Sequence, residues 1–78
     1  MIVITMESES CSWVALGNTE NEAREALRER WNKRQRHLKQ NGTINQEWII
    51  SNVSKLEEEY GFKTYDVEPG QCLMDWEI

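Results

Sequence analysis

Two short apolar runs near the start of the chain predict a pair of β-strands. Residues 2–6 are β-branched or apolar, the polar residues 7–10 interrupt them, and residues 11–16 resume the apolar composition. Short runs of β-branched and aromatic residues that are bounded by polar turn residues are typical of strands. The pattern therefore predicts two strands joined by a short polar turn.

The spacing of apolar residues further along predicts one long helix. Thr19 and Glu22 have the spacing of a capping box, in which each side chain bonds a free amide at the helix start. Gly42 supplies the positive φ that helix ends commonly need, so we expect the helix to stop there. Arg30 and Arg34 fall on the apolar side, so either their guanidinium groups extend past the core edge or the helix runs beyond the body of the domain. The apolar positions are Ala23, Ala26, Leu27, Trp31 and Leu38.

A second helical pattern occupies residues 43–60. Thr43 and Gln46 form another capping-box pair, and Gly61 is placed to end the helix. Trp48 falls to one side of the apolar stripe on this helix. The stripe consists of Ile49, Val53, Leu56 and Tyr60, with Ile50 beside it.

The last part of the chain predicts a β-hairpin. Residues 62–67 have strand composition, residues 68–71 place Pro and Gly where a type II turn needs them, and residues 72–78 alternate apolar and polar side chains. The whole pattern predicts a single domain over residues 1–78 with the element order ββααββ. The expected fold class is α+β, with a four-stranded antiparallel sheet and an α-hairpin on one face in two layers.

The basic residues are concentrated in the first predicted helix. Residues 24–39 hold seven of the nine lysines and arginines and two glutamates, a net charge of +5. The other 62 residues hold two lysines and twelve acidic residues, a net charge of −10, so the chain as a whole carries −5. Such a separation of charge steers partners of opposite sign but specifies no chemistry.

The outer side of the basic helix is a candidate contact surface for a nucleic-acid backbone, and Trp31 on the same helix could stack on a base or sugar. An ordinary solvated helix is the alternative, because basic residues near a helix C-terminus complement the macrodipole. The negative charge of the whole chain opposes non-specific binding to phosphate. The candidate contact residues are Arg24, Arg28, Lys33, Arg36 and Lys39.

The acidic residues form a second candidate surface for a protein partner. Carboxylates at the C-terminus of a helix oppose its dipole unless something basic faces them. That basic group is internal if the two helices are antiparallel, since Arg24 and Arg28 then lie near the end of the second helix. It is external if the carboxylates occupy a cationic groove meant for nucleic acid, and a third interpretation is a solvated face that keeps a small protein soluble. The candidate residues are Glu57, Glu58 and Glu59 on the helix, and Asp66, Glu68, Asp75 and Glu77 around the hairpin.

Trp48 is the candidate aromatic contact with a partner. It lies off the main apolar stripe of its predicted helix, and tryptophan is enriched at interface hot spots. The alternative is that Trp48 packs over the loop formed by residues 40–43.

The sequence offers little for catalysis or for holding a metal or a cofactor. His37 is the single histidine, and Cys11 and Cys72 lack both a paired histidine and a metal-ligand spacing. We therefore expect a protein that is not an enzyme, with no cofactor and no metal site. The absence of a signal-peptide pattern and of a disulfide framework predicts a cytoplasmic location. No stretch approaches the roughly 20 apolar residues of a membrane span.

Two resemblances bear on function. Residues 13–23, which run from Trp13 through Thr19 and Glu22 to Ala23, resemble the strand, turn and helix start of HicB-type antitoxins. In length, acidic charge and tryptophan content the chain is similar to small acidic phage- and mobile-element-encoded inhibitors of the anti-CRISPR kind. That second resemblance implies a stoichiometric blockade inside a bacterial host cell.

The expected function is that of a small protein-interaction module, an inhibitor that blocks a basic surface of a nucleic-acid-handling protein. The alternative is a nucleic-acid-binding or antitoxin-like module that uses the basic helix over residues 24–39. This alternative module could act as a homodimer, because a sheet edge exposed at residues 2–6 or 72–78 would allow strands of two copies to pair.

Overall fold

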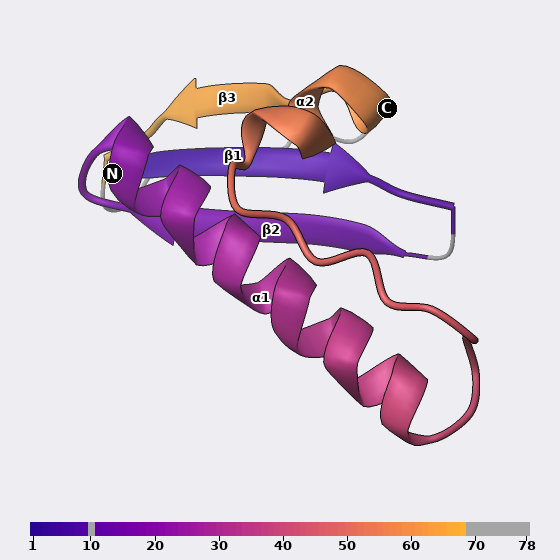
Figure 1. The fold of residues 1–78 in the computed structure, drawn as a ribbon. Helices are drawn as coiled ribbons and strands as arrows, with labels where there is room; N and C mark the ends of the chain where they lie inside the picture. The colour runs from indigo at the N-terminus through magenta and orange to yellow at the C-terminus, as the bar shows by residue number, and fades with distance from the viewer. Residues whose placement is uncertain (10, 69–78) are drawn as a thin grey trace.

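A computed structural model describes residues 1–9 and 11–68 of the chain. Two strands come first, then a long helix, an irregular segment, a short helix and a third strand (Figure 1). The elements are β1 (Ile2–Glu7), β2 (Ser12–Gly17), α1 (Glu20–Gln40), α2 (Ser54–Tyr60) and β3 (Lys63–Asp66).

The three strands form one antiparallel sheet in the order β2-β1-β3. Ile4, at the middle of the central strand, lies opposite Ala15 on β2 and opposite Thr64 on β3. The ladder between β1 and β3 continues past the strand ends, because the Val67 amide donates to the Met1 carbonyl at 2.8 Å. The predicted strands at residues 2–6, 11–16 and 62–67 are thus confirmed.

The start of α1 follows the capping chemistry expected from the sequence. The Thr19 side chain accepts a hydrogen bond from the Glu22 amide at 3.1 Å, and the Glu22 carboxylate accepts one from the Asn18 amide at 3.2 Å. Gly17 lets the helix start approach the end of β2, since a Cβ there would lie 2.5 Å from the Ala23 nitrogen. The strand-to-helix connection is therefore short and closely packed.

One hydrophobic core lies between the sheet and the two helices. Both helices cover the same face of the sheet, because side chains of each belong to the cluster that includes the inward residues of β1 and β2. The buried members of this core are Ile4, Met6, Trp13, Ala15, Ala23, Leu27, Trp31, Ile50, Val53 and Leu56. The architecture is a two-layer α+β fold.

The predicted four-stranded sheet is wrong, because the sheet formed by the described residues has three strands. The residues predicted to form the last strand, 72–78, lie outside the described part of the chain. The order of elements that the structure shows is ββααβ.

The predicted second helix over residues 43–60 is also wrong in extent, because α2 begins only at Ser54. Side chains of α1 form hydrogen bonds with backbone groups of the segment that precedes α2. The Trp31 indole donates to the Trp48 carbonyl at 2.9 Å, and the Gln35 side chain accepts from the Trp48 amide at 3.0 Å. These hydrogen bonds hold the segment away from a helical backbone conformation, so a tertiary interaction overrides the local pattern.

Candidate binding surfaces

Arg24 is half-buried and contacts the first turn of α2. Its guanidinium donates to the Glu57 carboxylate at 3.0 Å and to the Ser54 hydroxyl at 3.3 Å. The same guanidinium lies 5.4 Å from the centre of the Phe62 ring, within the range of a cation–π contact. The internal partner expected for the carboxylates of the second helix is therefore found, for Glu57.

Two further basic residues of the predicted contact surface are also paired internally. The Arg28 Nε donates to Glu25 Oε1 at 2.9 Å, and an Arg28 terminal nitrogen contacts the same oxygen. This hydrogen bond lowers the pKa of Glu25 and raises the pKa of Arg28. Lys39 lies 3.7 Å from the Glu47 carboxylate. Arg28 and Lys39 thus each face an acidic side chain of their own chain.

The C-terminal half of α1 carries the basic residues that remain. Lys33 and Arg36 are exposed and have no ion pair within residues 1–9 and 11–68. Arg30 is exposed as well, and Arg34 is half-buried. We define Arg30, Lys33 and Arg36 as the free basic face. The sequence pattern placed Arg30 and Arg34 on the apolar side, but Arg30 lies three residues before Lys33, so helical spacing could have grouped these two.

The acidic candidate residues divide into paired and unpaired groups. Glu57 is the partner of Arg24, and Asp66 lies 3.9 Å from the N-terminal amine. Glu58 and Glu59 are exposed and have no ion pair in the described part of the chain. Glu68 is exposed at the end of that part. Asp75 and Glu77 lie outside the described residues.

Trp48 is 41% exposed. Its backbone is fixed, because its carbonyl accepts from the Trp31 indole and its amide donates to the Gln35 side chain. Its ring stands edge-on to the Trp31 ring, with the centroids 5.7 Å apart. Trp48 therefore presents part of its indole to solvent from a backbone that is held in place.

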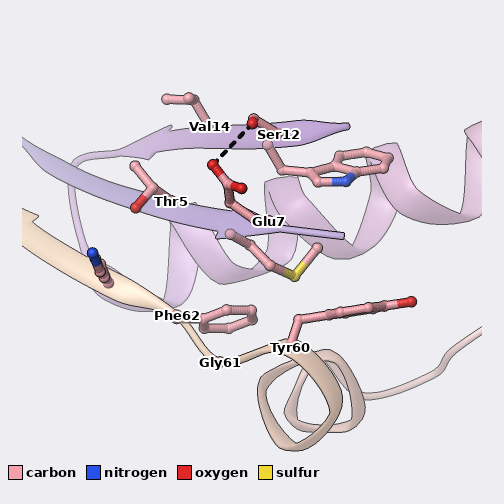
Figure 2. A pocket seen from close by; sticks show the side chains of 10 residues that line it. Thr5, Glu7, Ser12, Val14, Tyr60, Gly61 and Phe62 are labelled. Atoms are coloured by element: carbon pink, nitrogen blue, oxygen red, sulfur yellow. Dashed lines mark hydrogen bonds between the residues drawn. The ribbon is translucent and has the colours of Figure 1, made fainter. Parts of the chain in front are cut away.

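A cavity of about 640 Å³ opens beside the first residue of β3, where β1 continues past its pairing with β3. Figure 2 shows Thr5 and Glu7 of β1 and Ser12 and Val14 of β2 on one side, with Tyr60 and Phe62 on the other. The Ser12 hydroxyl donates to the Glu7 carboxylate at 3.2 Å. The described residues of this lining include no histidine.

A second, smaller cavity of about 220 Å³ has aromatic walls. We call it the aromatic groove. Its lining residues come from the β1–β2 turn, β2, α1, the segment before α2, and α2 itself: Ser8, Glu9, Trp13, Trp31, Arg34, Gln35, Leu38, Ile44, Trp48 and Tyr60. The sequence did not predict this groove, because no local pattern shows that four aromatic residues from four segments meet.

Residues 1–9 and 11–68 contain no group of three or more histidine, cysteine or acidic side chains placed to hold a metal ion. Over the same residues, no helix has both the length and the apolar character that crossing a bilayer requires. His37 is exposed, and Cys11 is a half-buried free thiol packed against the core.

Comparison of the chain with protein-family models, with curated proteins and with solved structures found no match in any of the three.

Proposed function

We propose that this protein is a non-catalytic interaction module, a stoichiometric inhibitor of the anti-CRISPR kind. It acts by covering a basic surface of a nucleic-acid-handling protein, inside a bacterial cell whose phage or mobile element encodes it. The observation that carries the proposal is the difference between Glu57, which has an internal partner, and Glu58 and Glu59, which have none in the described chain.

The position of Glu58 and Glu59 makes this difference informative. Both lie in the last turn of α2, which has no basic residue. The carbonyl end of a helix dipole disfavours negative charge there. Glu57 lies in the first turn and has Arg24 as its partner, whereas no ion pair in the described chain involves Glu58 or Glu59. A basic surface on a partner would balance the charge of these two carboxylates.

The internal pairing of the basic helix supports the same choice. Arg24, Arg28 and Lys39 are each engaged by a carboxylate of their own chain. Binding to nucleic acid would have to break these contacts or work without them. An acidic and aromatic contact surface needs no such rearrangement.

Affinity capture from a bacterial lysate, with and without nuclease, tests this proposal when it is done with matched charge reversals. The variant Glu58→Lys with Glu59→Lys should lose a basic, nuclease-insensitive partner. The control variant Lys33→Glu with Arg36→Glu should keep it. Loss of the partner only in the control variant would overturn the proposal.

A nucleic-acid-binding or antitoxin-like role is the second candidate, and the free basic face favours it. Arg30, Lys33 and Arg36 are exposed along one side of α1 without an ion pair in the described chain. A homodimer joined through the edge strand β2 would present two such faces. This role predicts that a labelled oligonucleotide binds the purified protein with strong salt dependence, and that Lys33→Glu with Arg36→Glu abolishes the binding.

A further inference from the structure

The aromatic groove is organised around the ring of Trp31. The Trp31 centroid lies 5.3 Å from that of Trp13, 5.7 Å from that of Trp48 and 5.9 Å from that of Tyr60. Trp31 and Trp13 are nearly buried, whereas Trp48 is 41% exposed and Tyr60 is half-buried. The first two rings therefore form the base of the groove, and the other two form walls that a ligand can reach.

The polar atoms of the two base rings are already satisfied within the protein. The Trp31 indole donates to the Trp48 carbonyl at 2.9 Å, and the Trp13 indole donates to the Ser8 hydroxyl at 3.0 Å. The groove thus offers a ligand the π faces and edges of its rings rather than these two donors. Aromatic π faces carry negative electrostatic potential and attract cations.

Carboxylates add negative charge beside these rings. Glu9 lines the groove from the turn that joins β1 to β2. Burial, and then the charges of Glu9 and Glu59, raise the pKa of Tyr60, so both carboxylates act on its phenol. Neither Glu9 nor Glu59 has an ion pair within the described residues. Arg34, on α1, also lines the groove and carries a positive charge, so the attraction for a cation comes from Glu9 and from the ring faces.

We infer that the aromatic groove receives an arginine side chain of the protein partner, with the guanidinium against Trp48 and Tyr60 and its charge balanced by Glu9. A guanidinium suits this site better than an ammonium, because it is planar, stacks on aromatic rings and is more weakly hydrated. The inference rests on the proposed function, since a protein with a basic surface supplies the arginine. The arginine contact is a specific interaction in addition to the attraction between the acidic surface and the basic partner.

The purified protein tests this inference without any partner. N-acetyl-arginine amide is titrated into ¹⁵N-labelled protein while the indole N–H signals of the tryptophans are followed. N-acetyl-citrulline amide is the matched probe, because its side chain has the same shape without the charge, and N-acetyl-norleucine amide reports simple apolar binding. We expect saturable shifts of the Trp31 and Trp48 signals with arginine, and binding of citrulline weaker by about fivefold or more.

Substitutions in the groove should act selectively on the arginine probe. Trp48→Ala should remove the saturable shift, and Trp48→Phe should restore part of it, because phenylalanine keeps an aromatic face. Ile49→Ala is the matched control, since Ile49 is also 41% exposed but does not line the groove. Glu9→Gln should weaken binding, whereas Glu58→Gln should leave it unchanged.

Three results would overturn the inference: no saturable shift with arginine, equal binding of citrulline, or tighter binding of norleucine. Failure of the proposed function would look different. If arginine binds the groove but Glu58→Lys with Glu59→Lys retains the captured partner, the acidic-surface proposal fails and the groove stands. If arginine does not bind but that variant loses the partner, the groove inference fails alone.

Discussion

The Asn32 side chain forms two hydrogen bonds with the backbone of Ile50, one in each direction. Its amide nitrogen donates to the Ile50 carbonyl at 2.8 Å, and its amide oxygen accepts from the Ile50 amide at 2.9 Å. Asn32 is only 3% exposed, so water does not compete for these groups. These two hydrogen bonds take the place of those that a neighbouring strand would form with Ile50. They fix the segment before α2, which also carries Trp48.

Removing the Asn32 side chain should destabilise the fold. Asn32→Ala leaves the buried Ile50 amide and carbonyl without their partner, and each unsatisfied buried group costs about 1–3 kcal/mol. We expect a loss of about 2 kcal/mol or more in the free energy of unfolding, measured by urea denaturation. Asn45→Ala, at an exposed position, is the control and should change little. Equal stability of the two variants would contradict the role given to Asn32.

Gly17 should be intolerant of any side chain for a steric reason. A Cβ there would lie 2.5 Å from the Ala23 nitrogen and 3.0 Å from the Ala23 Cα, both of which are backbone atoms. Gly17→Ala must therefore displace the start of α1, at a cost of about 1–3 kcal/mol. Gly42→Ala makes a useful comparison, because Gly42 has open space around it but a φ of +81°. Thermal unfolding should show the larger loss for Gly17→Ala, and the reverse order would refute the close approach.

Glu25 should titrate below its ordinary range because Arg28 hydrogen-bonds to its charged form. Arg28→Ala should raise the pKa of Glu25 again, as followed by NMR of the side-chain carboxyl carbon. A pKa lowered by folding stabilises the folded state above the ordinary pKa of the carboxyl, and this contribution is lost as pH falls through the lowered value. The stabilisation is small because the pair is exposed. An unchanged pKa of Glu25 in the variant would contradict the pairing.

Tyr60 should ionise above the ordinary pKa of tyrosine, first because of burial and then because of Glu9 and Glu59. Glu9→Gln should lower the pKa of Tyr60 only in part, since burial remains, and Glu58→Gln should leave it unchanged. Absorbance of the phenolate during alkaline titration measures this in a Tyr65→Phe background, where Tyr60 is the one remaining tyrosine. Because folding raises this pKa, stability should decrease as pH rises above about 10. If the two substitutions changed the pKa of Tyr60 equally, the placement of Glu9 beside Tyr60 would be contradicted.

Local patterns in the sequence were enough to predict the first half of the fold. The strand composition of residues 2–6 and 11–16 and the capping pair of Thr19 and Glu22 each depend on nearby residues, and all three appear in the structure. The prediction of the second helix failed because the start of that helix depends on residues distant in the sequence. Asn32 and Gln35 offer hydrogen bonds that the periodicity of residues 43–53 does not reveal.

The candidate surfaces show the same division. The pairing of Arg24 with Glu57 could be anticipated from charge order along two packed helices, and it is present. Arg28 was expected near the same carboxylates but bonds to Glu25 on its own helix, three residues away. The aromatic groove could not be anticipated, because it exists only when the β1–β2 turn, β2, α1, the segment before α2 and α2 are packed together.

We propose that this protein blocks a nucleic-acid-binding surface of its partner. The most direct test of this proposal uses the captured partner, a labelled nucleic acid bound to it, and fluorescence anisotropy during addition of this protein. Our account predicts release of the nucleic acid that is complete near one equivalent, and no release by the Glu58→Lys, Glu59→Lys variant. Nucleic acid that stays bound while this protein occupies the partner would contradict the account.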